Sequence, residues 1–172
     1  MATQKEIQDF ENSVWEKFLT NATPQEIHQS VIDSNWDGNE FLVNWIKNNP
    51  NVDKATALIA YWMSAPRWYK QYKDRAEVPS YEIKNFDFVE EVEQKYSAGF
   101  WKNSNIELNP KCDCDGFDWT SEYLDKTTVR EISTIMYQKL EGEKIDRPDG
   151  WEEGLPEKFA QQIHDFLEEN DI

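Results

Sequence analysis

The sequence predicts a mainly α-helical, compact multi-helix domain of about seven helices, with a long irregular loop and little β-structure. Helix start signals recur: Thr3 is followed three residues later by Glu6, and Thr23 is followed by Pro24 and Glu26, both capping-box patterns. Apolar residues then recur at intervals of three and four. Proline and glycine interrupt these runs, which limits each helix to a few turns.

Four helices are expected in the first half of the chain, two of them after the capping boxes. The third is expected to open with Asp37 as its N-cap, three residues before Glu40, and to stop before Pro50. The fourth is expected from Lys54 to about Ser64 and is apolar nearly all round, which indicates a central position. The residues expected to face the core are Ile7, Phe10, Val14, Phe18, Ile27, Val31, Phe41, Leu42, Trp45 and Ile46.

Three further helices are expected in the second half. One includes residues 88–96 and ends near Gly99, one is capped by Thr128 with Glu131 three residues later, and the last opens at Pro156. The apolar residues expected to face inward from the last two are Val129, Ile132, Met136, Leu140, Phe159, Ile163 and Phe166.

The chain of 172 residues is of a size that suits one domain. Residues 100–118 are expected to form the long loop, with a short strand at about 105–108. Within the single domain 1–172, residues 1–75 form a helical half with 10 acidic and 8 basic residues. Residues 76–172 form an acidic half with 24 acidic and 10 basic residues, so the negative charge is concentrated there.

The net charge of −16 excludes a general nucleic-acid binder, which needs cations for the phosphates. It also disfavours binding to an anionic membrane surface. The aromatic content of 14% supplies material for a core and argues against disorder. A signal-peptide pattern and an apolar run of about 18 residues are both missing, so we expect a cytoplasmic protein.

Two short motifs invite a metal hypothesis. Asp33–Gly38 matches the first six positions of an EF-hand loop, but Glu40 stands at an apolar position and Asn44 replaces the final bidentate glutamate. The segment Cys112–Asp115 offers two thiols and two carboxylates without a second ligand pair. We therefore predict no metal and no cofactor, with calcium at the first motif and zinc at the second as the alternatives.

No catalytic constellation is apparent. His28 and His164 lie in separate predicted helices, and the sequence contains none of the serine-hydrolase, zinc-protease or glycine-rich phosphate motifs. We predict a non-enzymatic protein with no catalytic residues. An enzyme with an unrecognised carboxylate-lined site, in which a carboxyl pKa is raised, is the alternative.

A basic and aromatic segment at 62–75 has two interpretations. Its interleaved rings and cations resemble a stacking surface for single-stranded nucleic acid. The alternative, which we favour because the overall field repels phosphates, is that the rings pack inward and the cations offset the acidic half. The residues concerned are Trp62, Trp68, Tyr69, Tyr72, Arg67, Lys70, Lys73 and Arg75.

Carboxylates interspersed with aromatic residues in the acidic half are typical of a surface that captures a basic partner, because charge steers the encounter and aromatic rings anchor the complex. A solvated acidic surface that maintains solubility is the alternative. The predicted partner-binding residues are Asp113, Asp115, Asp118, Trp119, Glu122, Trp151, Glu152 and Glu153.

Residues 25–75 contain a Trp-Asp turn at Trp36-Asp37, an Asn-Pro turn at Asn49-Pro50 and a Thr-Ala-Leu helix with aromatic residues. Through these motifs the segment resembles the bacterial DUF4274 family. The resemblance implies a small, mainly helical domain of unknown function and gives no catalytic residues. The motif positions look architectural, as caps, turns and a packed indole: Asn35, Trp36, Asp37, Asn49, Pro50, Asp53 and Thr56.

These observations favour a non-enzymatic binder of a basic protein, and specifically an immunity protein that inhibits a basic, nuclease-type bacterial toxin. An acidic inhibitor can occupy the basic active site of such a toxin, and electrostatic steering makes the encounter fast at low salt. A structural or regulatory interaction domain unrelated to toxins is the other non-enzymatic alternative.

Overall fold

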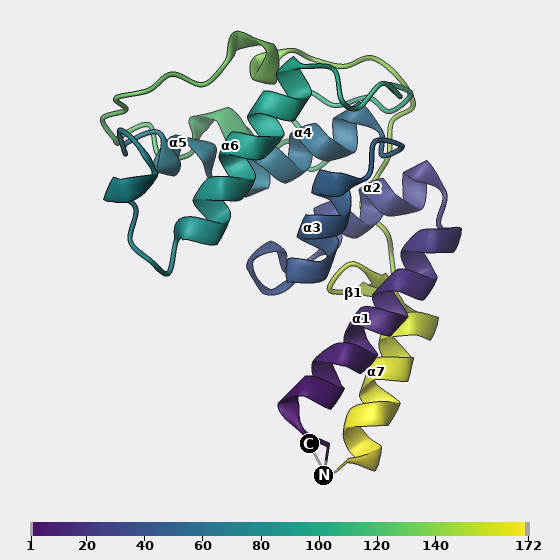
Figure 1. The fold of residues 1–172 in the computed structure, drawn as a ribbon. Coiled ribbons are helices and arrows are strands. Elements are labelled where there is room, and N and C mark those ends of the chain that lie inside the picture. Colours follow the sequence, from purple (N-terminus) through teal and green to yellow (C-terminus); the bar gives the residue numbers. More distant parts are fainter. Residues whose placement is uncertain (1, 171–172) are drawn as a thin grey trace.

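The computed structural model describes residues 2–170, and seven α-helices dominate that part of the chain (Figure 1). A two-stranded antiparallel hairpin is the regular sheet of the described residues. The helices are α1 (Gln4–Asn21), α2 (Pro24–Asp33), α3 (Glu40–Asn48), α4 (Lys54–Met63), α5 (Pro66–Tyr69), α6 (Ile83–Ser97) and α7 (Glu157–Glu169). The strands are β1 (Trp151–Glu152) and β2 (Leu155–Pro156), and the 3₁₀ turns are η1 (Trp36–Gly38), η2 (Arg75–Glu77), η3 (Trp119–Ser121) and η4 (Thr134–Tyr137).

The predicted starts of α1, α2 and α4 are confirmed. Thr3 and Thr23 each accept the N–H of the glutamate three residues on, and that glutamate accepts the N–H of the threonine, which completes both capping boxes. Asp53 caps α4 by accepting the N–H of Ala55 at 2.9 Å. Local polar chemistry therefore fixes where three of the helices begin.

The start of α3 differs from the prediction that Asp37 caps it. The helix begins at Glu40, and the side-chain oxygen of Asn39 accepts the N–H of Leu42 at 3.0 Å. The backbone of Asp37 lies inside η1, and its side chain lies outside the described part of the structure. Asparagine is as good an N-cap as aspartate, so the Asp37–Glu40 spacing matched a capping box that the chain does not use.

Helix α4 is the centre of the fold, as its apolar sequence predicts. All residues from Ala55 to Trp62 are buried, and α2, α3, α5 and α6 pack around this helix. The indole N–H of Trp62 donates to the carbonyl of Met136 at 2.9 Å, so the irregular second half is tied to the same core.

The predicted helix at 128–140 is wrong. The segment is irregular apart from η4, and Val129, expected to face inward, is 60% exposed. Its backbone amides bind distant groups in place of a helical ladder: the N–H groups of Val129 and Arg130 both donate to the Lys70 carbonyl, and that of Ser133 donates to Glu93. Packing against α5 and α6 therefore outweighs the local helix signal.

The expected strand near 105–108 is reduced to two isolated bridges. Ile106 pairs with Glu143, and Leu108 pairs with Leu140. Leu140 therefore takes part in a β-bridge, whereas the sequence predicted it on the inward face of a helix. Ile132 and Met136 are buried as expected, so the inward residues of this region were found although its secondary structure was not.

The two ends of the chain pair with each other. Helices α1 and α7 run antiparallel and project from the body, with both termini at the tip (Figure 1). The rings of Phe10 and Phe166 stack with centroids 4.1 Å apart, and Phe18 contacts Phe159 nearer the body. Buried residues of both sequence halves join one hydrophobic core. No helix within residues 2–170 has the length and apolarity needed to cross a membrane.

Candidate functional site, an acidic cleft beside helices α1 and α7

The predicted partner-binding acids of residues 113–122 lie in a tightly bonded loop. One oxygen of Asp113 accepts the N–H groups of Asp115 at 2.9 Å and Phe117 at 2.8 Å. Its other oxygen accepts the indole N–H of Trp119 at 2.7 Å. Asp118 closes the next turn by accepting the N–H and hydroxyl of Thr120. The chain itself supplies donors to Asp113 and Asp118. The contact of Asp113, Asp115, Asp118, Trp119 and Glu122 with a partner stays a prediction.

Asp115 and the EF-hand-like motif meet at one arginine. The Arg147 guanidinium lies 2.8 Å from Asp115 and 3.5 Å from Asp33, and it also donates to the carbonyl of Ile32. Asp33 accepts the N–H of Gly154 as well. The first carboxylate of the calcium-like motif is therefore used to join α2 to the hairpin.

The loop that carries Cys112 and Cys114 lies close to His28, which belongs to a different helix. His28 and the two cysteines, Cys112 and Cys114, line a small cavity of about 40 Å³ together with Asp113. Burial lowers the pKa of His28 to about 4, and its Nδ1 lies 2.9 Å from the Thr56 hydroxyl. This long-range approach has no local sequence signal, because Cys112 follows His28 by 112 − 28 = 84 residues.

A three-residue group with metal-ligand spacing is present in the same loop. One ligand atom each from Asp113, Cys114 and Asp115 lies within 4.8 Å of the others. Both carboxylates are already engaged, and burial followed by the neighbouring acids raises the pKa of the Cys114 thiol. The group therefore has a structural explanation without an ion.

The basic segment packs inward in part, as the favoured interpretation expects: Trp62, Tyr69 and Lys70 are buried, whereas Lys73 and Arg75 are exposed. The ammonium of the buried Lys70 lies 2.9 Å from Glu90 and 2.8 Å from Glu93 on α6. Arg67 donates to two backbone carbonyls, and Arg75 pairs with Asp87. The rings of Trp62 and Tyr69 are buried and are not available for stacking, whereas Trp68 and Tyr72 are partly buried.

The second predicted acidic group, residues 151–153, sits on the β1–β2 hairpin. Trp151 is partly buried and its ring packs edge-on against Phe18, with centroids 5.7 Å apart. Glu152 and Glu153 are exposed, and Glu153 has a left-handed φ of 48° at the hairpin turn. Gly154 follows, where a Cβ atom would lie 2.6 Å from the Ser30 carbonyl oxygen, so a close backbone approach fixes the turn.

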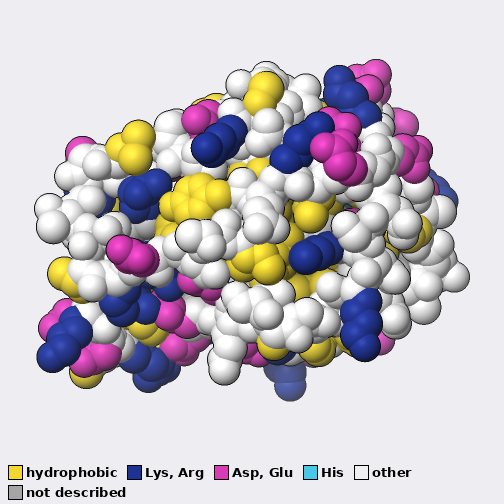
Figure 2. Space-filling view, turned by 90° about the horizontal axis from the view of Figure 1, so that it is seen from above, with side chains coloured by type: hydrophobic (Ala, Val, Ile, Leu, Met, Phe, Trp, Pro, Cys, Tyr) yellow, Lys and Arg dark blue, Asp and Glu magenta, His cyan; other side chains and the backbone are white. Residues whose placement is uncertain are grey.

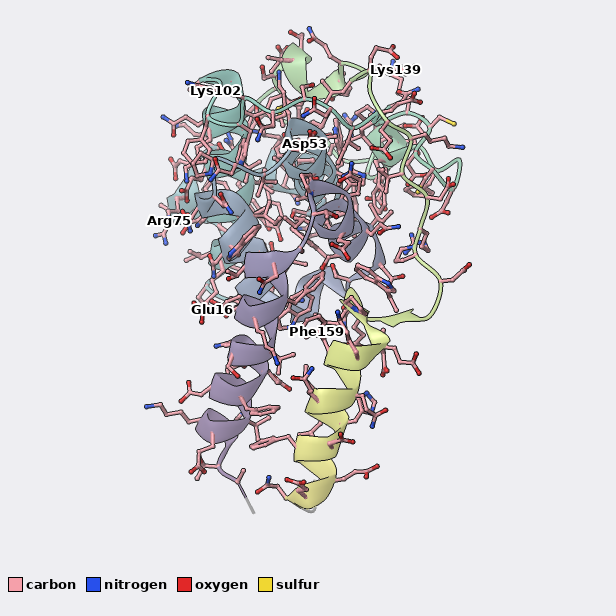
Figure 3. The ribbon with its side chains drawn as sticks, turned by 90° about the vertical axis from the view of Figure 1, so that its right-hand side faces the viewer. Glu16, Asp53, Arg75, Lys102, Lys139 and Phe159 are labelled. Atoms are coloured by element: carbon pink, nitrogen blue, oxygen red, sulfur yellow. The ribbon has the colours of Figure 1, made fainter. Side chains whose placement is uncertain are left out.

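Glu152 and Glu153 line a cleft of about 270 Å³, which we call the acidic cleft. Its walls come from α1, from η1 and the start of α3, and from the hairpin and α7. Figure 3 shows α1 and α7 side by side, with the hairpin at the N-terminal end of α7, next to the body of the molecule. The charged and carboxamide side chains of the cleft are Gln8, Glu11, Asn12, Asn35, Asn39, Glu40, Glu152, Glu153 and His164.

The acidic cleft holds two carboxylates without a cation. Glu40 pairs with Lys84 at 3.0 Å, and Glu152 lies 3.0 Å from the His164 ring. Glu11 and Glu153 form no ion pair with any residue of the described range 2–170. Burial, and then the charge of Glu153, raises the pKa of Glu11, so an added cation in the cleft would relieve an unfavourable arrangement.

The acidic character does not extend over the whole surface. The face in Figure 2, seen from the end opposite the α1–α7 tip, has hydrophobic side chains in its centre, with Lys and Arg as well as Asp and Glu around them. Lys102 and Lys139 lie at this end in Figure 3. The molecule therefore has one end with exposed cations, and it has an acidic cleft beside the arm.

Comparison with known proteins gives a family match for part of the chain. Residues 22–97 match the family model DUF4274, a domain of unknown function. The match extends beyond the expected 25–75 and covers α2 to α6, including the η1 wall of the acidic cleft. Glu11, Glu152 and Glu153 lie outside it. Searches of the curated proteins and of the solved structures give no match.

Proposed function

We propose that the protein is a non-enzymatic acidic binding protein whose acidic cleft receives lysine or arginine side chains of a basic partner protein. The observation that carries the proposal is the pair Glu11 and Glu153, which share a cleft without a counter-charge. An ion pair formed there with a partner would offset a repulsion that the free protein already contains. The carboxamides of Gln8, Asn12 and Asn35, which line the cleft, would supply neutral acceptors.

A bacterial toxin that acts on nucleic acid is the partner class that fits this charge. Such a toxin needs cations to hold phosphates, and a net charge of −16 on its inhibitor supports rapid association with that cationic site. We accordingly propose an immunity protein that works in the cytoplasm. Steering of this kind weakens as ionic strength rises.

One observation favours a second candidate function. Glu11 has a raised pKa beside another carboxylate in a cleft, which is the arrangement that a general acid requires. An enzyme of this kind would use Glu11 to protonate a leaving group. It would show turnover that the E11Q variant lacks, whereas a binder would show none.

The test is a pull-down with three baits from a lysate of the native host. The baits are the wild-type protein, the cleft variant E11Q/E152Q/E153Q and the matched variant E16Q/D149N/E168Q. The last removes the same charge from exposed positions outside the cleft. Bound proteins are identified by mass spectrometry at low and high salt, and the activity of any basic protein is then assayed with and without each bait.

We expect a basic protein on the wild-type and matched baits, loss of it from the cleft variant, release at high salt and inhibition of its activity. Equal loss from both variants would assign binding to net charge alone and reject the cleft. Retention by all three baits would place the interface elsewhere on the molecule.

A further inference from the structure

A second cleft lies between the α4–α5 junction and η3, and we call it the aromatic cleft. It has a volume of about 390 Å³ and shares no lining residue with the acidic cleft. Aromatic side chains and one carboxylate distinguish its lining, namely Trp68, Tyr69, Trp119, Tyr123 and Glu122. Trp119 and Glu122 belong to the predicted partner-binding residues, so the structure brings two of these together with a ring of the basic segment.

The indole rings of the aromatic cleft are held in place from outside it. The Trp68 N–H donates to Glu82 at 3.0 Å, and the Trp119 N–H donates to Asp113 at 2.7 Å. Tyr123 meets the Trp68 ring edge-on at 5.6 Å. Because both indole donors are used elsewhere, these rings offer the cleft carbon edges and π-faces, with no indole N–H left to donate to an anion.

The carboxylate of this cleft lacks a counter-charge. Burial raises the pKa of Glu122, and its side chain forms no ion pair within the described residues 2–170. Arg67 donates to the backbone carbonyl of Glu122 and so does not neutralise the carboxylate. A partly desolvated carboxylate beside electron-rich rings creates a negative potential suited to a cation.

One cation of the chain already uses these rings. The ammonium of Lys126 lies over the Trp68 ring, 5.0 Å from its centroid. In this contact the π-face of Trp68 accepts a positive charge. Lys126 also lies 3.5 Å from Asp125, so its charge is shared with a carboxylate outside the cleft lining.

Backbone strain is concentrated at the same place. Three non-glycine residues in the described range have a left-handed φ, and two of them, Ala65 at 51° and Tyr123 at 54°, line the aromatic cleft. A left-handed backbone is unfavourable for both residue types and persists where the surrounding contacts impose it. The Tyr123 ring at this position lies beside Trp68.

We propose that the aromatic cleft binds a methylated or quaternary ammonium group, with the rings of Trp68, Trp119 and Tyr123 around the cation and Glu122 balancing its charge. A bare ammonium would lose more hydration than a single carboxylate can replace, whereas methyl groups suit carbon edges and π-faces. This inference is independent of the proposed function, because the acidic cleft uses other residues.

Choline is the probe for this site, and 3,3-dimethylbutan-1-ol is its uncharged counterpart of nearly equal shape. Binding is followed by tryptophan fluorescence and by isothermal titration calorimetry on the full chain. We expect choline to bind and the neutral alcohol to bind at least about tenfold more weakly, because the cation–π attraction requires the charge.

Two cleft variants and one control decide the assignment. E122Q keeps the shape of the cleft and is expected to weaken choline binding about tenfold. Y123G removes one ring and the strain of its backbone, so it should weaken binding without loss of folding. E153Q, in the acidic cleft, should bind choline as the wild type does. Equal affinity for choline and the neutral alcohol, or unchanged affinity in E122Q, would overturn the proposal.

Discussion

The loop at residues 109–122 and the acidic cleft contain similar carboxylates in opposite situations. In the loop, Asp113 accepts three N–H groups and Asp115 pairs with Arg147. In the cleft, Glu11 and Glu153 pair with no cation of residues 2–170, and burial followed by the charge of Glu153 raises the pKa of Glu11. Gln8 donates to Glu11 at 3.4 Å, but no cation of the described residues pairs with Glu11. The difference teaches that a carboxylate helps to fix the fold where the chain supplies several N–H donors or a cation, and is a candidate binding group where it lacks a cation.

The largest expected effect is on the loop side. Asp113→Ala removes the acceptor of three hydrogen bonds and leaves the Trp119 indole without its partner. We expect the free energy of unfolding to fall by about 3 kcal/mol, from charge-assisted hydrogen bonds that are each worth about 1.5–3 kcal/mol and do not add fully. Urea denaturation followed by tryptophan fluorescence measures this loss.

The cleft supplies the control for that measurement. E153Q removes a carboxylate of equal charge from the other region, and we expect a change below about 0.5 kcal/mol, as for an exposed surface position. If both variants lose the same free energy, the distinction between fold carboxylates and site carboxylates is wrong.

A pH effect of nearly the same size is expected at His28. Its pKa is about 4 in the folded protein because of burial, against 6.5 as its ordinary value. Between these values the unfolded chain binds a proton that the folded protein does not, so stability is complete above pH 6.5 and is lost as pH falls toward 4. Over this pH range the free energy of unfolding is expected to fall by about 3 kcal/mol in total.

His28 also reports on the loop, because it shares a cavity with Cys112, Asp113 and Cys114. In the D113A variant a loosened loop should admit water, and the pKa of His28 should move back toward 6.5. Nuclear magnetic resonance titration of the His28 ring measures both states. A pKa that stays at about 4 in D113A would show that α2 and α4 bury His28 without help from the loop.

Much of the helical part could be predicted from sequence because its signals are local. The caps at Thr3, Thr23 and Asp53 and the apolar run of α4 each act within a few residues. The prediction of a helix at 128–140 was wrong because the interactions of this segment are not local. Its amides bind Lys70 and Glu93, about 40 to 60 residues earlier in the chain, which no local pattern encodes.

The candidate site divides in the same way. Glu152 and Glu153 were predicted from the acidic composition around Trp151, whereas Glu11 was missed because it joins them only through the pairing of α1 with α7. The aromatic cleft likewise joins Trp68 to Trp119 across 50 residues of chain. Sequence therefore indicated the type of side chain, and tertiary pairing decided which ones meet.

The smallest expected effect on stability concerns Glu11 in the acidic cleft, and its pH dependence has the opposite sign to that of His28. Burial and Glu153 raise the pKa of Glu11, so its ionised form is less favourable in the folded protein than in the unfolded chain. Stability should therefore rise as pH falls through the folded pKa of Glu11. E11Q removes this penalty and is expected to stabilise the protein at pH 7 by about 0.5 kcal/mol, a value kept small by solvent screening.

Thermal unfolding of E11Q at pH 7 and at about pH 4 tests this sign, because the gain should shrink once Glu11 is protonated in the wild type. E16Q, on the same helix and exposed outside the cleft, is the matched control and should show no such pH-dependent gain. A destabilised E11Q at pH 7 would mean that the Glu11 carboxylate is already stabilised by the chain. In that case Glu11 would belong with Asp113 among the carboxylates of the fold, and the acidic cleft would lose the residue on which its proposed function rests.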